Sequence, residues 1–183
     1  MDVNLQKIFD AQTELMHKYH PIEEALGYHP PHAPVDIQSR TGQDRLRQFA
    51  WWITEEVVEL ETADPDEIMG EMSDVLHFVV ELCILSGVDA TVSIPSKLLN
   101  QFEPMPEIVD PYDIILTVGE AINKLKAKPW KQTPKPVDED LFRSAIKEAL
   151  RITCQLIDQQ GWDIEELYFM KNAVNQTRIQ TGY

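Results

Sequence analysis

The stretch TEEVVELETADPDEIMGEMSDVLHF, from Thr54 to Phe78, joins two helical patterns through a short break. Apolar residues recur every three or four positions on both sides, which predicts one helix over residues 43–62 and another over 65–86. Within the break ADPDE we expect Asp64 to cap the second helix and the following proline to occupy its first position. Gly87 is then the residue that ends the helix. Because the connection is so short, the two helices are expected to be antiparallel neighbours.

The same helical period extends over most of the chain. It predicts further helices at about residues 3–19, 111–127, 141–160 and 163–179. Residues 20–42 are rich in proline and histidine and predict an extended connection. The chain has only seven glycines, and β-branched residues hardly alternate with polar ones, so strands are not expected. The pattern predicts a single all-α domain, a helical bundle that spans residues 1–183.

An internal repeat is indicated by a shift of 74 residues. The shift lays EMSDVLHFVVELCILSGVD over AIKEALRITCQLIDQQGWD and brings Asp74 onto Glu148. We interpret this as a degenerate repeat of a two-helix unit, with an active pair at about 43–86 and a degenerate pair at about 111–160. Ala145 stands where the first unit has its other acidic residue, so only the first pair keeps the complete acidic set.

The composition excludes several classes of partner. The 31 acidic and 16 basic residues give a formal net charge of −15, which disfavours binding to nucleic acid or to an anionic membrane surface. No apolar run approaches the roughly 20 residues of a membrane span, and the N-terminus lacks the apolar region of a signal peptide. The two cysteines, Cys83 and Cys154, lie in apolar helical patterns and are expected to be buried thiols. A cytoplasmic protein is expected.

Four acidic residues form two pairs with equal spacing. Glu56 and Glu59 share one side of the first helix, and Glu71 and Asp74 share one side of the second. Acidic residues at helical spacing usually form a solvated face, but two such pairs beside the apolar stripes of consecutive helices favour a shared site. Four carboxylates need a counter-charge, and Mg²⁺ prefers carboxylate oxygens, with Mn²⁺ as an alternative ion.

A basic and amide-bearing face is predicted on the last helix, at about 163–179. Lys171, Asn175 and Arg178 are spaced by four and three residues, so they lie on one side of that helix. These side chains suit phosphate oxygens, but bases near a helix C-terminus also suit the helix dipole. The spacing alone leaves both interpretations open.

Beside these residues the chain resembles a known family. EEVVEL and EMSD are similar to the E-E-x-x-E and E-x-x-D motifs of the all-α NTP pyrophosphatases, which include MazG proteins and dimeric dUTPases. LYFMKNAVNQTRIQTGY resembles the ending of dimeric dUTPases and, most closely, that of phage-type dCTP/dUTP pyrophosphatases. The resemblance implies that the substrate contacts are Gln12, His77, Lys171, Asn172, Asn175, Arg178 and Tyr183.

The resemblance implies Mg²⁺-dependent hydrolysis of a deoxynucleoside triphosphate to the monophosphate and pyrophosphate, with dUTP or dCTP favoured. It assigns Glu56 to orienting the attacking water with support from Glu55, and the metal to the two acidic pairs. Trp52 is a candidate for stacking on the base, although a tryptophan on a helix face is more often part of the core. A nucleotide contact and a packing role are equally expected for His77.

Three further expectations concern substrate and assembly. A purine substrate such as dGTP or dATP, or a broad MazG-like specificity, is the alternative to a pyrimidine. A catalytically inactive helical regulator is the alternative from another functional class. The family is mostly dimeric, and a chain with two units would need one two-fold partner, so a homodimer is expected. If the protein is of phage origin, its compartment would be the host cytoplasm.

Overall fold

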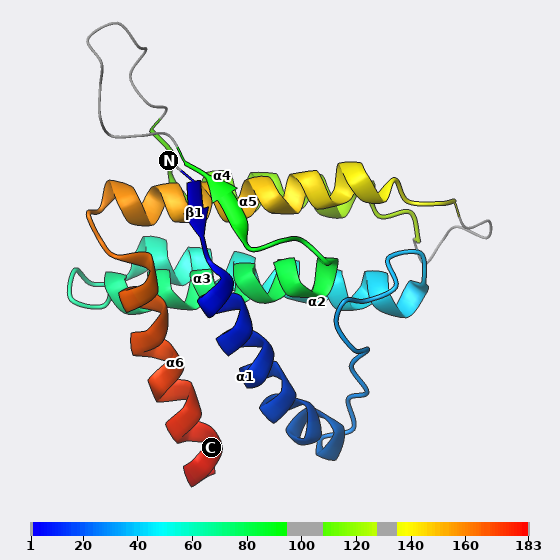
Figure 1. The fold of residues 1–183 in the computed structure, drawn as a ribbon, viewed down its shortest axis with the longest axis horizontal. Coiled ribbons are helices and arrows are strands. Elements are labelled where there is room, and N and C mark those ends of the chain that lie inside the picture. The colour runs from blue at the N-terminus through cyan, green and yellow to red at the C-terminus, as the bar shows by residue number, and fades with distance from the viewer. Residues whose placement is uncertain (1, 95–107, 128–134, 183) are drawn as a thin grey trace, which may run out of the picture.

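The computed structural model describes residues 2–94, 108–127 and 135–182. Within these ranges the chain forms six helices and one two-stranded ribbon, which confirms the all-α prediction (Figure 1). The elements are β1 (Asp2–Asn4), α1 (Gln6–Ala25), α2 (Arg40–Thr62), α3 (Ile68–Ser86), β2 (Thr91–Ser93), α4 (Pro111–Lys124), α5 (Glu139–Gln159) and α6 (Ile164–Thr181).

Helix α3 lies at the centre of the bundle. It packs against α1, α2, α5 and α6, while α4 packs on α2 and α5. A helix with neighbours on several sides must be apolar nearly all round, and α3 buries residues such as Val75, Leu76 and Leu85 on different sides. Helices α1 and α6 cross the bundle and project from it as two diverging arms (Figure 1). The functional residues predicted on α3 therefore face several helices.

Several helices begin or end at residues with a local capping role. Ser39 caps α2 by accepting a hydrogen bond from the Gly42 amide at 3.0 Å, and Asp110 caps α4 with a reciprocal contact to Asp113. Gly87 ends α3 in the left-handed conformation at φ 69°, which a glycine adopts without steric strain. That end is the one the sequence predicts.

Two predicted helix boundaries are wrong. Helix α3 begins at Ile68 and not at Pro65, because residues 65–67 form a turn in which the Glu67 amide donates to the Asp64 carbonyl at 2.9 Å. Asp64 therefore uses its backbone and does not cap the helix with its side chain. Helix α1 continues through Pro21 to Ala25, although the sequence places these residues in an extended connection.

A short ribbon was also not predicted. Strands β1 and β2 pair antiparallel, with Val3 opposite Val92, and each strand has three residues. Segments this short carry too little alternation to be detected by periodicity. The ribbon ties the start of α1 to the segment that follows α3, and the Leu5 amide extends the contact by donating to the Ala90 carbonyl at 2.8 Å.

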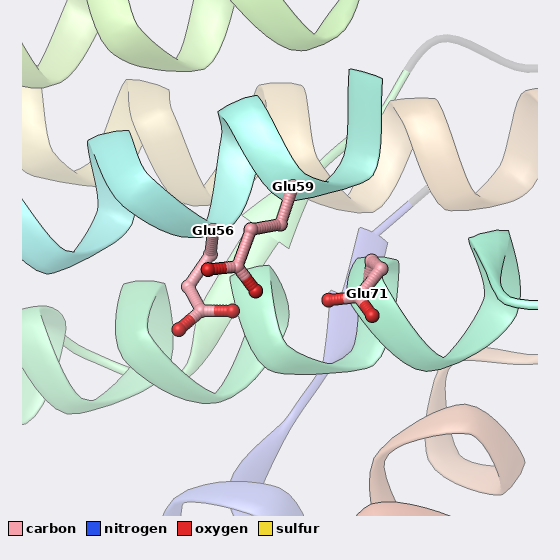
Figure 2. Close-up of side chains that lie close together, drawn as sticks. All are labelled: Glu56, Glu59 and Glu71. Carbon is pink, nitrogen blue, oxygen red and sulfur yellow. The ribbon is translucent and has the colours of Figure 1, made fainter. Parts of the chain in front are cut away.

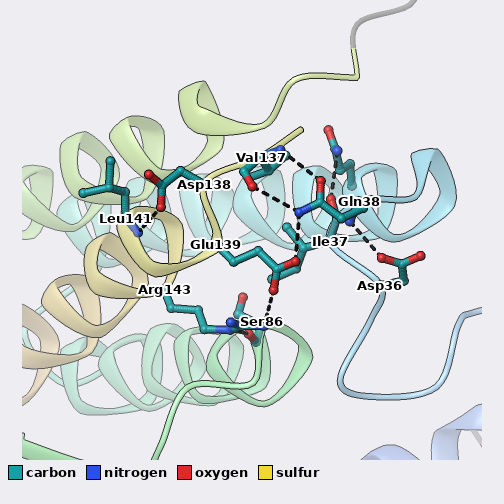
Figure 3. A network of polar contacts seen from close by, with 10 residues as sticks. Asp36, Ile37, Gln38, Ser86, Val137, Asp138, Glu139, Leu141 and Arg143 are labelled. Carbon is teal, nitrogen blue, oxygen red and sulfur yellow. Dashed lines mark hydrogen bonds and ion pairs between the residues drawn. The ribbon is translucent and has the colours of Figure 1, made fainter. Parts of the chain in front are cut away.

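The connection between α1 and α2 is held by side-chain contacts at the far end of the bundle (Figure 3). The amide of Gln38 donates to the Val137 carbonyl at 3.1 Å and accepts from the Val137 amide at 2.9 Å. Arg143 links Glu139, at 2.7 Å, to the carbonyl of Ser86 at 3.0 Å. Gln38 thus ties the connection between α1 and α2 to the segment before α5. Arg143 ties the start of α5 to the end of α3.

No helix in the described ranges is both long and apolar enough to cross a bilayer.

Candidate active site

A cavity of about 1500 Å³ opens between α1, α2, α3 and α6. The stripe of α3 that is only partly buried lines it, with Glu71, Asp74, Phe78 and Glu81 in sequence order. The connection at residues 30–34 closes one side. The two projecting helices therefore contribute walls to the same space that the acidic residues face.

Three of the four predicted metal ligands lie together in this cavity. Glu56 and Glu59 come from α2 and Glu71 comes from α3, and each offers a carboxylate oxygen within 4.8 Å of the others (Figure 2). Antiparallel packing of α2 on α3 brings the two acidic faces together, as their helical spacing predicts. Glu56 and Glu71 are half-buried and Glu59 is exposed, so the group lies at the mouth of the cavity.

The electrostatics of this group fit a divalent cation. Burial, and after it the charges of Asp74, Glu59 and Glu71, raise the pKa of Glu56 to about 7. The pKa of Glu71 is also raised, first by burial and then by Asp74 and Glu59. Carboxylates that hold protons near neutral pH lack a counter-charge, and a hard cation with oxygen ligands would supply it. The residues present therefore fit Mg²⁺.

Asp74, the fourth predicted ligand, is paired with a lysine in the structure. Lys171 on α6 donates to an oxygen of Asp74, and both side chains are about one-fifth exposed, at 19% and 20%. The ion pair brings the predicted phosphate-binding helix onto the acidic pair of α3. Asp74 lies next to the three glutamates, since its charge acts on Glu56 and Glu71, but it is not one of the residues whose oxygens group within 4.8 Å.

Aromatic side chains form the wall next to the acidic residues. The Trp52 ring lies 4.8 Å from that of Phe49 and 5.8 Å from that of Phe78, and it is partly buried. The Arg45 guanidinium lies over the Phe49 ring at 4.7 Å and is anchored by Glu23 at 2.7 Å. Trp52 thus packs against the core and lines the cavity at once, so both predicted roles are compatible with its position.

The inner wall is a hydrogen-bonded chain between three helices. Gln12 on α1 donates through Nε2 to Glu81 on α3 at 2.9 Å. It accepts at Oε1 from the hydroxyl of Tyr168 on α6 at 2.8 Å. Asn172 donates to the same hydroxyl at 3.1 Å. The helices meet here through polar contacts in a place where Gln12 is only 2% exposed.

His77 presents a hydrogen-bond acceptor to this wall. Its Nδ1 lies 2.9 Å from the Ser73 carbonyl, a contact that requires a proton on Nδ1 and leaves the lone pair on Nε2. Burial lowers the pKa of His77 to about 4, so the ring is neutral at pH 7. The ring stacks on Tyr168 at 4.2 Å, and its buried Nε2 has no hydrogen-bond partner among the residues that the structure describes. A buried acceptor without a donor is expected to serve a ligand.

The other predicted site residues divide into four groups. Asn175 and Arg178 line the cavity. Asn172 contacts Tyr168 and lies behind the cavity wall. Glu55 is exposed and accepts a hydrogen bond from the Trp51 indole at 2.8 Å. It points away from Glu56 because adjacent residues on a helix point in different directions. The structure therefore does not bring Glu55 into the cavity, and Tyr183 lies outside the described residues.

Sequence reasoning did not find three residues of this site: Arg45, Glu81 and Tyr168. Glu81 follows Asp74 by seven positions and His77 by four, so helical spacing already places it on the stripe that faces the cavity. Arg45 precedes Phe49 by four positions on the side of α2 that carries Trp52. Tyr168 gives no such signal, because its role depends on contacts with other helices.

Comparison with known protein families matches residues 42–183 of the chain to the family described as dUTPase. The matched region contains the acidic residues of α2 and α3 and all of α6, but not α1. Searches of the curated proteins and of the solved structures gave no match.

Proposed function

The chain belongs to the all-α dUTPase family, and on this premise we propose that it hydrolyses dUTP to dUMP and pyrophosphate in the cavity between α1, α2, α3 and α6. The observation that carries the proposal is the grouping of Glu56, Glu59 and Glu71 at one end of that cavity. Lys171 and Arg178 line the same space. An acidic cluster beside basic side chains suits a triphosphate that arrives with a cation.

The cation we propose is Mg²⁺, held by Glu56, Glu59 and Glu71, with Asp74 as a further ligand. When bound, Mg²⁺ supplies neutralisation of the negative charge on the triphosphate and on the leaving pyrophosphate. Asp74 would first have to leave its ion pair with Lys171. Lys171 would then be available to the phosphate groups, which fits the role that the family resemblance gives it.

Glu56 is the residue we assign to the attacking water. Its carboxylate is half-buried among the other acidic residues of the cavity, and a carboxylate placed there can take the proton of the attacking water. Water attacks the α-phosphorus, a new P–O bond forms, and the bond to the bridging oxygen breaks. The water proton passes to the Glu56 carboxylate and the bond electrons leave with pyrophosphate. Asn175 and Arg178 hold phosphate oxygens through the amide and guanidinium groups that they direct to the cavity.

We propose that the nucleobase lies against the wall that carries Gln12, His77 and Trp52. Gln12 and the Nε2 atom of His77 provide hydrogen-bonding groups there, and Trp52 provides an aromatic surface. The family match supports dUTP, dCTP is the other pyrimidine that the resemblance favours, and a purine triphosphate or a broad specificity stay alternatives. The resemblance to phage-type enzymes also stays a prediction. An inactive regulator is disfavoured because the acidic residues remain grouped.

The experiment is a phosphate-release assay with added inorganic pyrophosphatase and a panel of dUTP, dCTP, dGTP, dATP and UTP. We expect release from dUTP in Mg²⁺, a lower rate from the other nucleotides, and no release in EDTA. Omission of the added pyrophosphatase is the control, since the product should then be pyrophosphate and not phosphate. Absence of release from every nucleotide, with either Mg²⁺ or Mn²⁺, would overturn the proposed function.

A further inference from the structure

Gln12 is held at both ends of its side-chain amide. The Nε2 group donates to Glu81 at 2.9 Å, and the Oε1 atom accepts from the Tyr168 hydroxyl at 2.8 Å. The two partners lie on α3 and α6, whereas Gln12 lies on α1. The contacts therefore join three helices at one side-chain amide.

The two partners dictate which way the amide faces. An ionised carboxylate can only accept, so Glu81 selects the NH₂ end of Gln12. Burial raises the pKa of Glu81 to about 7, while the Arg45 charge and the Gln12 hydrogen bond oppose this shift, so the group is mostly ionised at pH 8. Rotation of the amide by 180° would place its carbonyl oxygen against the carboxylate.

Tyr168 reinforces the same orientation. Its hydroxyl accepts a hydrogen bond from Asn172 at 3.1 Å, which leaves the single hydroxyl hydrogen for the Gln12 carbonyl. Burial raises the pKa of Tyr168, so the hydroxyl keeps this hydrogen. Both contacts therefore favour one orientation of an amide that has little access to water.

The fixed amide still has capacity for a ligand in the cavity wall. One N–H and one carbonyl lone pair of Gln12 are not used by Glu81 and Tyr168. In uracil, the N3–H donor lies beside the O4 acceptor. In cytosine the same edge has an acceptor at N3 and a donor at the C4 amino group. An amide whose carbonyl accepts from uracil N3–H and whose NH₂ donates to uracil O4 would be mismatched with cytosine in the same position. Its carbonyl would face the acceptor N3, and its NH₂ would face the C4 amino group.

Resting on the proposed function, we propose that Glu81 and Tyr168 are positioning residues that hold the Gln12 amide in the orientation that selects uracil over cytosine. They act through Gln12 and need not touch the nucleotide themselves. Buried polar groups left mismatched by the wrong base destabilise its complex, and such sites reach discrimination of about 10⁴-fold or more in favourable cases.

The test measures binding and does not depend on hydrolysis. Calorimetry at pH 8 with Mg²⁺ compares the non-hydrolysable α,β-imido analogues of dUTP and dCTP. We expect the unaltered protein to favour the uracil analogue by at least ~100-fold. In the Glu81→Gln variant, the new side-chain amide can both donate and accept hydrogen bonds, so the Gln12 amide can also adopt the rotated orientation. We expect this variant to reduce the preference for the uracil analogue at least ~10-fold, chiefly by tighter binding of the cytosine analogue.

Tyr168→Phe keeps the ring beside His77 and removes only the hydroxyl. We expect a smaller reduction of the preference, about 3-fold to 10-fold, in this second variant. In a Gln12→Ala background, Glu81→Gln should leave the preference unchanged, because the residue through which it acts is gone. Ile146→Val, which trims a fully buried side chain on α5, controls for loss of stability and should alter both affinities equally.

The inference is overturned if the unaltered protein does not favour the uracil analogue, or if the two Gln12 partners can be changed without reducing its preference. It is also overturned if Glu81→Gln acts equally well without Gln12. If the preference for the uracil analogue changes in the variants as expected but the protein hydrolyses no nucleotide, only the proposed function is overturned.

Discussion

The carboxylates of Glu56, Glu59 and Glu71 have oxygens within 4.8 Å of one another and need a cation to be ionised together. We predict that Glu59→Gln lowers turnover of dUTP at least ~100-fold, because damage to metal stabilisation of a transition state removes several kcal/mol. Asp74→Asn is expected to have a similar effect. Phosphate release at saturating Mg²⁺ measures both.

The matched control for these variants is Glu61→Gln, which removes an exposed carboxylate of the same helix. It should leave turnover within about 2-fold, since exposed substitutions away from a site usually have small effects. The fold should persist in all three variants, which circular dichroism would verify. Full activity of Asp74→Asn would remove this residue from the metal site.

The pKa of Glu56 also predicts how stability changes with pH in the absence of metal. Its pKa of about 7 in the folded protein lies above the 4.5 of an unperturbed glutamate, so the folded protein binds more protons between these limits. The free energy of unfolding contributed by this group therefore falls as pH rises from about 4.5 through 7. His77, with its pKa lowered to about 4, acts in the opposite direction below pH 6.5.

Comparison with Glu56→Gln isolates the contribution of that residue, because His77 and Glu81 are present in both proteins. In EDTA, we expect the melting temperature of the unaltered protein to fall more steeply between pH 5 and pH 7.5 than that of the variant. Differential scanning calorimetry measures both slopes. Equal slopes would mean that Glu56 is not held in a carboxylate-rich, partly buried environment.

At the scale of elements, α3 and α6 divide the work of the site. α3 carries the stripe of Glu71, Asp74, His77 and Glu81, and its other sides are packed into the bundle. α6 contacts α3 and α1, and its later turns carry Asn175 and Arg178 in the cavity lining, while Gln176 accepts a hydrogen bond from Lys18 on α1. The central helix α3 positions the acidic side chains, and the projecting helix α6 supplies contacts to the substrate.

Removal of the later turns of α6 should therefore affect substrate binding more than folding. We predict that truncation after Ala173 raises KM for dUTP at least ~10-fold, because it deletes Asn175 and Arg178 from the cavity wall. Lys171, Asn172 and Tyr168 remain, so the contacts of α6 with Asp74 and Gln12 are kept, while the exposed hydrogen bond from Lys18 to Gln176 is lost. Steady-state kinetics measures KM, and the far-UV circular dichroism should stay nearly unchanged. An unchanged KM would mean that the terminal motif only ends a helix.

At the scale of the whole molecule, the cavity has walls on α1 and α6 that project from the bundle (Figure 1). Both carry exposed apolar side chains, with Leu26 72% exposed beyond the end of α1 and Met170 46% exposed on α6. Apolar side chains at such positions are suited to contact with another subunit. A second copy would cover them and narrow the mouth of the cavity.

We predict a homodimer of about 42 kDa, twice the chain mass of 21.1 kDa. Light scattering coupled to size-exclusion chromatography measures it. Leu26→Ser should weaken the dimer, whereas Leu116→Ser, which removes a similarly exposed leucine (66%) from α4, should not. A fully active monomer would show that one chain encloses the substrate alone.

The sequence by itself determined the helices and the composition of the acidic site. Helix-forming periodicity, the stop at Gly87 and the spacing of Glu56 with Glu59 are local properties, and local geometry fixes which side chains share one side of a helix. The errors fell where local signals were weak or misleading: the start of α3, the last turns of α1 beyond Pro21, and the short ribbon.

Only the tertiary structure decided which sides of different helices meet. Gln12 contacts Glu81 and Tyr168, which lie 69 and 156 positions away in the chain, and Lys171 reaches Asp74 across 97 positions. The pKa values of Glu56, His77 and Glu81 likewise follow from burial by neighbouring helices. Periodicity shows that a side is apolar or acidic but carries no information on its partner. The positions of the proposed base-selecting residues therefore emerged only when α1, α3 and α6 were packed together.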